Sequence, residues 1–266
     1  MLSHRFEMAK ICGVVAALAV ALAGPAMAQT RPQPRPQPRP RQANGPRFFV
    51  DLSFGVNALS KSFSQASVLP INQENGSLTA RFAAKNGALF DVGGGVTLRR
   101  RLAVAVAYSH ASSKAGADVT ASIPHPLVFN QSRDIQGSIS GAVHAESAVH
   151  VDLMWMVAAT PGFELRAFAG PTFVTVRQDL ISSITYSETY PFDTATFTGA
   201  PTAKQSKSTT GFNAGIDVTK YFTKSFGVGG ILRATAASAK LDSPLGGQVK
   251  VRAGGLEAGA GVRLRF

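Results

Sequence analysis

Apolar side chains alternate with polar or small ones in a strict two-residue period from Phe48 onward. Successive side chains of an extended strand point to opposite faces, so this period indicates β-strands with one apolar face. In the first run the apolar face carries Phe48, Val50, Leu52, Phe54 and Val56. The opposite face carries Phe49, Asp51, Ser53, Gly55 and Asn57. A chain dominated by such runs belongs to the all-β class.

The same alternation recurs in seven further segments of the chain. They span residues 88–98, 102–109, 143–157, 163–177, 212–218, 226–234 and 256–266. Together the eight runs predict eight strands. In the run at 163–177, Phe168 breaks the parity, and a β-bulge at that residue would re-aim half of the strand.

The connections between these strands alternate between short and long. Short turns follow the strands that end at Leu98, Ala158 and Thr219. Long connections of more than 25 residues occupy 59–86, 112–141 and 178–209. This asymmetry predicts an eight-stranded antiparallel up-and-down transmembrane β-barrel with tight periplasmic turns and long outer loops. A soluble β-sandwich is the alternative, but its apolar faces need a second apolar layer.

Aromatic residues of the predicted strands fall at two depths. Near the short turns lie Phe48, Trp155, Phe163, Tyr221, Phe222, Phe226 and Phe266. Near the long loops lie Phe54, Phe90, Tyr108, Phe173 and Phe212. Aromatic rings favour the two headgroup levels of a bilayer, so this distribution supports the transmembrane barrel.

Two segments precede the strands. Residues 1–28 combine a charged start, a short apolar run and the triplet Ala26-Met27-Ala28, and this pattern predicts a cleaved secretory signal peptide. The single cysteine, Cys12, lies inside it, so the mature chain has no thiol chemistry. Residues 29–47 repeat Arg-Pro-Gln-Pro and predict an extended periplasmic linker, which is either a basic tether or an inert spacer.

At the C-terminal end, apolar residues alternate up to Phe266. This segment resembles the C-terminal assembly signal of Gram-negative outer-membrane proteins, and residues 48–266 resemble the small outer-membrane β-barrel domain family of OmpA-like and opacity-type surface barrels. The resemblance implies a place in the cell outer membrane, in contact with its lipid, after delivery by the barrel-assembly machinery. It implies an assembly signal formed by Gly261, Val262, Leu264 and Phe266. We expect a monomer.

Charged residues on the non-apolar faces point into such a barrel, whose eight strands enclose a space that side chains just fill. The candidate acids are Asp51, Asp91, Glu146, Asp152, Asp217 and Glu257. The candidate bases are Arg99, Arg233, Arg263 and Arg265, and Glu164 and Arg166 join the two sets if the strand at 163–177 keeps its parity. We expect Asp51 to meet Arg263, with Asp217 opposite. The near balance favours an ion-paired plug, and a conducting pore is the alternative.

Four polar residues share one face of the strand at 143–157, namely His144, Glu146, His150 and Asp152. Either histidine could be oriented by the acid two residues later, as in a general-base pair, or the group could share a metal. A barrel hydrolase would also need a nucleophile and an oxyanion site, and no Ser-centred motif indicates either. We therefore expect a satisfied polar lumen, no enzyme activity, no cofactor and no metal.

The formal net charge of +12 raises nucleic acid as a partner. However, residues 48–266 hold 20 of the 27 basic residues and 14 of the 15 acidic ones, so their excess charge is small and spread out. We expect no nucleic-acid partner. The favoured function is structural or surface interaction, with the long loops contacting an extracellular ligand or a host surface. A passive channel for small solutes or apolar molecules is the alternative.

Overall fold

The computed structural model describes residues 47–57 and 61–266. The predicted signal peptide and linker residues 29–46 lie outside the described residues. In the described part of the chain, no helix combines the length and the apolar character that a membrane span requires.

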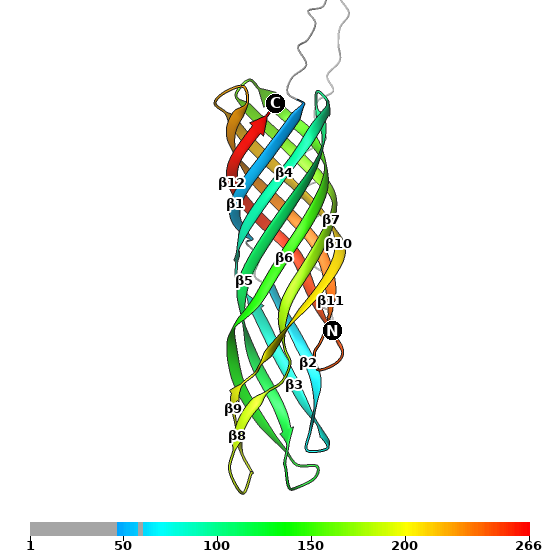
Figure 1. Ribbon diagram of the computed structural model, residues 1–266, viewed down its shortest axis with the longest axis vertical. Coiled ribbons are helices and arrows are strands. Elements are labelled where there is room, and N and C mark those ends of the chain that lie inside the picture. The colour runs from blue at the N-terminus through cyan, green and yellow to red at the C-terminus, as the bar shows by residue number, and fades with distance from the viewer. Residues whose placement is uncertain (1–46, 58–60) are drawn as a thin grey trace, which may run out of the picture. The chain divides into compact units, whose positions relative to one another are not determined.

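Twelve strands account for most of the described residues (Figure 1). The first six are β1 (Phe48–Asn57), β2 (Lys61–Ile71), β3 (Glu74–Ala84), β4 (Gly87–Arg99), β5 (Leu102–Pro124) and β6 (Ser132–Thr160). The others are β7 (Phe163–Ile181), β8 (Thr185–Glu188), β9 (Ala195–Gly199), β10 (Thr202–Tyr221), β11 (Phe226–Asp242) and β12 (Gln248–Arg265).

Eight of these strands form a closed antiparallel ring. Its order is β5-β4-β1-β12-β11-β10-β7-β6, and β6 pairs again with β5. Each of the eight predicted runs lies in one strand of this ring, so the predicted strand count and antiparallel arrangement are confirmed. The ends of β1 and β12 meet, because the Phe266 N–H donates to the Phe48 carbonyl oxygen at 2.9 Å.

The strand registers determine how steeply the strands cross the ring. A row of partners that starts at Leu102 returns to the same strand at Ser112, ten residues further on. The row passes through Leu102, Trp155, Ala167, Ile216, Leu232, Ala258, Val56, Ala88 and Ser112. With about 3.3 Å per residue and about 4.8 Å between strands, this displacement corresponds to a tilt of roughly 40°. A ring of eight strands has an interior that side chains can just fill.

β7 has no bulge at Phe168, so the strand keeps its parity there. β7 pairs with β10 without interruption, and the register shift lies on the neighbouring strand between Met156 and Ala158. Phe168 keeps the parity of its strand and is buried inside the ring. Gly215 leaves room for it, since a Cβ there would lie 2.5 Å from the Phe168 ring. An apolar residue on the inner face therefore reflects local space and not a change of register.

The long connections are mostly strand rather than loop. The β2–β3 hairpin pairs with β5 beyond the end of β4, and β5, β6, β7, β10, β11 and β12 continue past β1 and β4. We call residues 48–57, 87–112, 145–175, 211–236 and 254–266 the proximal half. We call residues 61–84, 113–144, 176–210 and 237–253 the distal half.

The two halves have opposite polarity. On β5 the outward side chains change from Val106, which is exposed, to Asp118, while the inward side chains change from Ser109 to Ile123. In the distal half the interior is an apolar core that includes Phe63 and Phe82, whose rings stack at 4.8 Å. The proximal half is therefore apolar outside and polar inside, and the distal half is the reverse.

Candidate functional site

The polar interior of the proximal half is the candidate site, and its first cluster lies near the ends of β1 and β12. Arg263 is fully buried and donates from Nε and Nη2 to Asp217 Oδ2 at 2.9 and 2.7 Å. Its Nε lies 3.6 Å from Asp51 Oδ1, and Asp51 is its direct partner across β1 and β12. The structure therefore brings together the three residues expected to meet.

Arg166 completes this cluster from β7. Its Nη2 lies 3.1 Å from Asp217 Oδ1, and its Nη1 lies 3.4 Å from Asp51 Oδ2. The guanidinium also lies over the Phe49 ring, 4.8 Å from the centroid. Two carboxylates thus alternate with two guanidiniums, and each charge has a partner of opposite sign.

Arg265 and Arg99 have different surroundings. Arg265 pairs with Glu164, lies 3.7 Å from the Tyr221 ring centroid and donates from Nε to the Lys224 carbonyl oxygen at 2.8 Å. Arg99 is exposed at the end of β4, where the register shifts between Thr97 and Arg99. Its prediction as a lumen ion-pair residue is wrong, because the strand ends before its side chain can turn inward.

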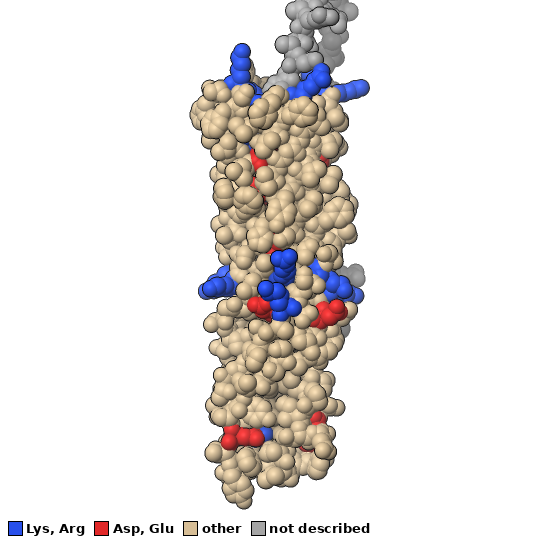
Figure 2. All heavy atoms as spheres, in the orientation of Figure 1, with Lys and Arg blue, Asp and Glu red and all other residues tan. Residues whose placement is uncertain are grey.

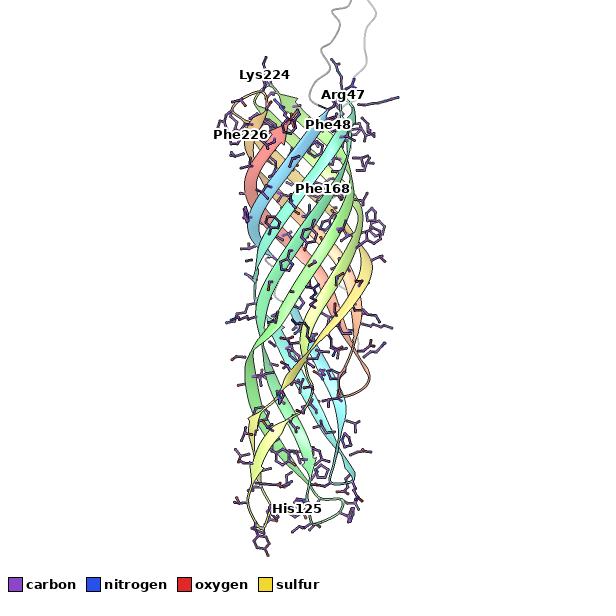
Figure 3. The ribbon with its side chains drawn as sticks, viewed as in Figure 1. Arg47, Phe48, His125, Phe168, Lys224 and Phe226 are labelled. Atoms are coloured by element: carbon purple, nitrogen blue, oxygen red, sulfur yellow. The ribbon has the colours of Figure 1, made fainter. Side chains whose placement is uncertain are left out.

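The second cluster is centred on Arg233, which lies farther from the short turns along the ring axis. Arg233 Nη1 lies 2.5 Å from Asp91 Oδ2 and 3.4 Å from Glu257 Oε2. The Arg233 guanidinium also lies 5.5 Å from the centroid of the Phe168 ring, which is labelled in Figure 3. Arg233, Asp91 and Glu257 are all buried, so the cluster is a second group of paired charges in the interior.

His150 and Asp152 are both buried, but hydrogen-bonded residues separate them. His150 Nε2 lies 3.0 Å from Ser109 Oγ, and its Nδ1 lies 2.8 Å from Thr172 Oγ1. Asn213 Nδ2 donates to Thr172 Oγ1 and to Asp152 Oδ1, each at 2.9 Å. The acid therefore does not orient the imidazole directly, and Ser109 and His150 are both buried.

His144 and Glu146 form the contact that their spacing predicts. His144 Nε2 lies 2.8 Å from Glu146 Oε1, while His144 Nδ1 lies 2.7 Å from Gln178 Oε1. Glu146 Oε2 accepts the Gly254 N–H at 2.8 Å. The cavity beside these residues measures about 10 Å³, close to the space that one water molecule needs. Among the residues described, no group of three or more His, Cys, Asp or Glu side chains is arranged to hold a metal.

Sequence reasoning missed several neutral partners in this interior. Ser53, Thr172, Gln178, Asn213 and Thr219 all contact the charged residues or the histidines. Each lies on the inner face of its strand, so the two-residue period already indicated that its side chain points inward. Their neutral side chains could not be told apart from ordinary lumen filling without the contacts.

The residues of the predicted assembly signal lie along β12 and just beyond it. Gly261, Val262 and Leu264 pair with Ser53, Leu52 and Val50 of β1. Gly261 is required by close approach, since a Cβ there would lie 1.9 Å from a β1 carbonyl oxygen. Phe266 is exposed. Their role in assembly stays a prediction.

No protein-family model matches the sequence, and no curated protein matches it. The chain is similar to outer membrane protein OprG from Pseudomonas aeruginosa, with 11% identity and a TM-score of 0.44 over 85% of this chain and 98% of that one. It is also similar to Ail, the attachment invasion locus protein of Yersinia pestis, with 12% identity and a TM-score of 0.34 over 82% of this chain and 99% of that one. A structure of Ail with the heparin analogue sucrose octasulfate gives 14% identity and a TM-score of 0.35 over the same shares. Because these TM-scores are below 0.5, the function proposed next is argued from this chain's own residues.

Proposed function

We propose that the chain is an integral outer-membrane β-barrel protein whose proximal half spans the bilayer and whose distal half stands outside as a β-structured head. The reversal of polarity along the same strands carries this proposal. Outward side chains of the proximal half include Phe212, Phe54 and Trp155, which are 73%, 60% and 51% exposed. Such surfaces need lipid around them, whereas the polar exterior and apolar core of the distal half suit water.

The height of the apolar surface supports the same arrangement. A strand tilted by roughly 40° rises roughly 2.5 Å per residue along the ring axis. On β1, β4, β7 and β10 the outward apolar residues cover about ten residues of height, or roughly 25 Å, which is the height of the apolar band of known transmembrane barrels. Figure 2 shows few charged side chains on this part of the surface.

The filled interior favours a closed barrel over a passive channel. Two clusters of buried arginines and carboxylates and the His144–Glu146 contact occupy successive levels. Opening a path would separate buried charges from their partners, which typically costs several kcal/mol per charge. The enclosed Ser109–His150 pair likewise supports a non-enzymatic role.

Exposed apolar side chains at the far end of the head support a surface-interaction role. Leu127, Phe129 and Tyr190 are 66%, 73% and 80% exposed, although they lie far from the apolar band. Figure 3 places His125, beside these residues, at the opposite end from Phe48 and Lys224. The Arg133 Nη1–H donates to the Phe192 carbonyl oxygen at 2.8 Å. This bond links the start of β6, next to the turn between β5 and β6, to the turn between β8 and β9. Apolar groups on a rigid scaffold are typical of a contact site for another molecule.

Folding and conductance measurements test this proposal. The purified protein, folded into neutral lipid vesicles, should migrate faster on unboiled than on boiled gels and should show mainly β circular dichroism. In a planar bilayer it should produce no lasting current. Substantial helix would overturn the barrel, and a stable open conductance in the wild type would replace the closed barrel with the passive channel.

A further inference from the structure

Five basic side chains lie on five different strands of the distal half, just beyond the apolar band. They are Lys114 on β5, Arg177 on β7, Lys207 on β10, Lys240 on β11 and Arg252 on β12. All five are exposed, and we call them the basic belt. Figure 2 shows Lys and Arg side chains gathered halfway along the molecule, separated from the charged end where the chain terminates.

The strand registers place the belt residues at one height. A row of partners climbs ten residues over the eight strands, which is about 1.25 residues per strand. After correction for this climb, the five residues fall within about one residue of each other, or roughly 3 Å along the axis. Among the described residues, the nearest outward carboxylates on these strands, Asp179 and Asp242, lie about two residues farther from the apolar band. Asp242 Oδ2 lies 3.7 Å from Lys207 Nζ, so Lys207 has an acidic neighbour within the protein.

The belt also lies at the level expected for lipid phosphates. The same correction puts it about four residues, or roughly 10 Å, beyond Phe173 and Phe212, which face outward at the edge of the apolar band. Headgroups extend roughly 5 to 8 Å beyond the hydrocarbon on each side of a bilayer. Long Lys and Arg side chains can reach back over that distance to the phosphate layer.

A surface groove below the belt has the same order of polarity as a lipid. It has a volume of about 380 Å³, and its wall includes Tyr108 and Phe173, followed by the hydroxyls of Ser147, Thr175 and Ser208. Thr175 Oγ1 lies 2.9 Å from Ser208 Oγ. Arg177 is the next outward residue of β7 after Thr175, so ring, hydroxyl and guanidinium follow one another away from the membrane.

We propose that the basic belt binds the phosphate groups of lipid headgroups in the leaflet that surrounds the far edge of the apolar band. This inference rests on the proposed membrane position of the proximal half. The equal height of the five cations favours a lipid layer over a soluble polyanion, because a layer meets every strand at one level whereas a single soluble chain meets one side. Each belt cation contributes electrostatic attraction to the phosphates, and the groove provides a seat for one lipid.

Lipid retention by native mass spectrometry tests the inference. The protein in neutral detergent is titrated with diphosphoryl lipid A, with monophosphoryl lipid A and with phosphatidylcholine. The wild type should retain the diphosphoryl form best. The variant Lys114→Gln/Arg177→Gln/Arg252→Gln should lose about a hundredfold or more in apparent affinity for it, because three cations at about 1 kcal/mol each amount to about 3 kcal/mol. The control Arg100→Gln/Arg101→Gln/Lys224→Gln removes the same charge from the opposite end and should stay within about twofold of wild type.

The possible failures are distinguishable. If the wild type does not fold in neutral vesicles, as judged by its gel migration, the proposed membrane position fails. If it folds there but the belt variant and the control retain diphosphoryl lipid A equally, only the belt inference fails. Binding of a soluble heparin fragment that depends on the belt, without preference among the lipids, would assign the belt to a soluble polyanion and overturn the lipid proposal.

Discussion

Arg263 shows that neighbours on several strands determine how strongly one buried charge is coupled to its partners. The sequence predicts that Asp51 is its main partner, and the two residues do lie opposite each other on β1 and β12. However, the shorter contacts of Arg263 go to Asp217, at 2.7 and 2.9 Å, whereas the contact with Asp51 is 3.6 Å. Asp217 is also more buried than Asp51. The stronger coupling therefore crosses the ring interior.

We expect Asp217→Asn to lower the free energy of unfolding by about 3 kcal/mol, because it leaves Arg263 and Arg166 without their nearest carboxylate. Asp51→Asn should cost about 1 kcal/mol, since its contacts with the two guanidiniums are longer, at 3.4 and 3.6 Å, and its side chain is less buried. Urea unfolding in lipid vesicles measures both. The control Asp242→Asn removes a carboxylate that is 65% exposed and should change stability by less than about 1 kcal/mol.

A double-mutant cycle with Arg263→Gln ranks the two partners directly. The coupling energy of Asp217 with Arg263 should exceed that of Asp51 with Arg263, because contacts in one buried network do not add independently. Equal couplings would contradict this ranking.

Sequence reasoning identified most charged residues of the interior because parity alone determines which face they occupy. It could not rank their contacts, since distances across the ring depend on the displacement of the registers. Arg99 failed for a related reason, because parity ceases to apply where β4 ends. Phe49 and Phe168 were harder still, since their inward rings depend on missing side chains at Gly95 and Gly215.

β6 shows how one element can belong to both halves of the molecule. It is 29 residues long and changes parity near Gly141, where the register with β5 shifts between Ala115 and Ala117. In the distal half Ile135 faces the core, and in the proximal half Glu146 faces the interior. Because of the shift, odd-numbered residues of β6 face inward before Gly141 and even-numbered residues face inward after it.

We expect Gly141→Val to lower the free energy of unfolding by about 1 to 2 kcal/mol. Gly141 has φ of 85°, a conformation that is costly for a residue with a Cβ, although the added atoms would meet nothing within 4 Å. Urea unfolding in vesicles measures the change. Gly116→Val on the opposite strand is the control, since Gly116 has no such φ and its Cβ would be 3.6 Å from its nearest neighbour. If both variants lose the same stability, backbone strain is not the cause.

The lengths of the elements were the weakest part of the sequence prediction. Alternation continues through Ala115, Ala117, Val119, Ala121 and Ile123, but small residues and a polar outer face make the pattern resemble a loop. A search for apolar residues facing lipid cannot find strands whose apolar side faces inward. The distal half therefore had to be seen in the structure.

At the scale of the whole molecule, the depth of the single tryptophan tests the position of the membrane. Trp155 faces outward near the short turns, and Val151 faces outward four residues further along β6. Moving the indole from 155 to 151 shifts it by roughly 10 Å along the axis, toward the middle of the apolar band. In the wild type, lipids brominated near the headgroup should quench fluorescence more than lipids brominated near the chain end. Trp155→Phe/Val151→Trp should reverse that order.

A matched variant makes the depth measurement specific. Trp155→Phe with Phe212→Trp places the indole on β10 near the other edge of the band, so shallow bromines should quench it again. The same quenching order in all three proteins would contradict the proposed membrane position.

The uninterrupted strands have a mechanical consequence. Six strands, β5, β6, β7, β10, β11 and β12, run from the proximal half into the distal half without a break, so the described residues of these strands form no hinge between the two halves. The turns that carry Phe129 and Tyr190 are therefore held at a fixed distance from the proximal half, roughly 30 Å beyond the basic belt along the axis. In the proposed membrane position, a surface coat thinner than this would leave the tip free to touch what lies beyond, and a thicker coat would cover it, so coat thickness would decide when the tip can make contact.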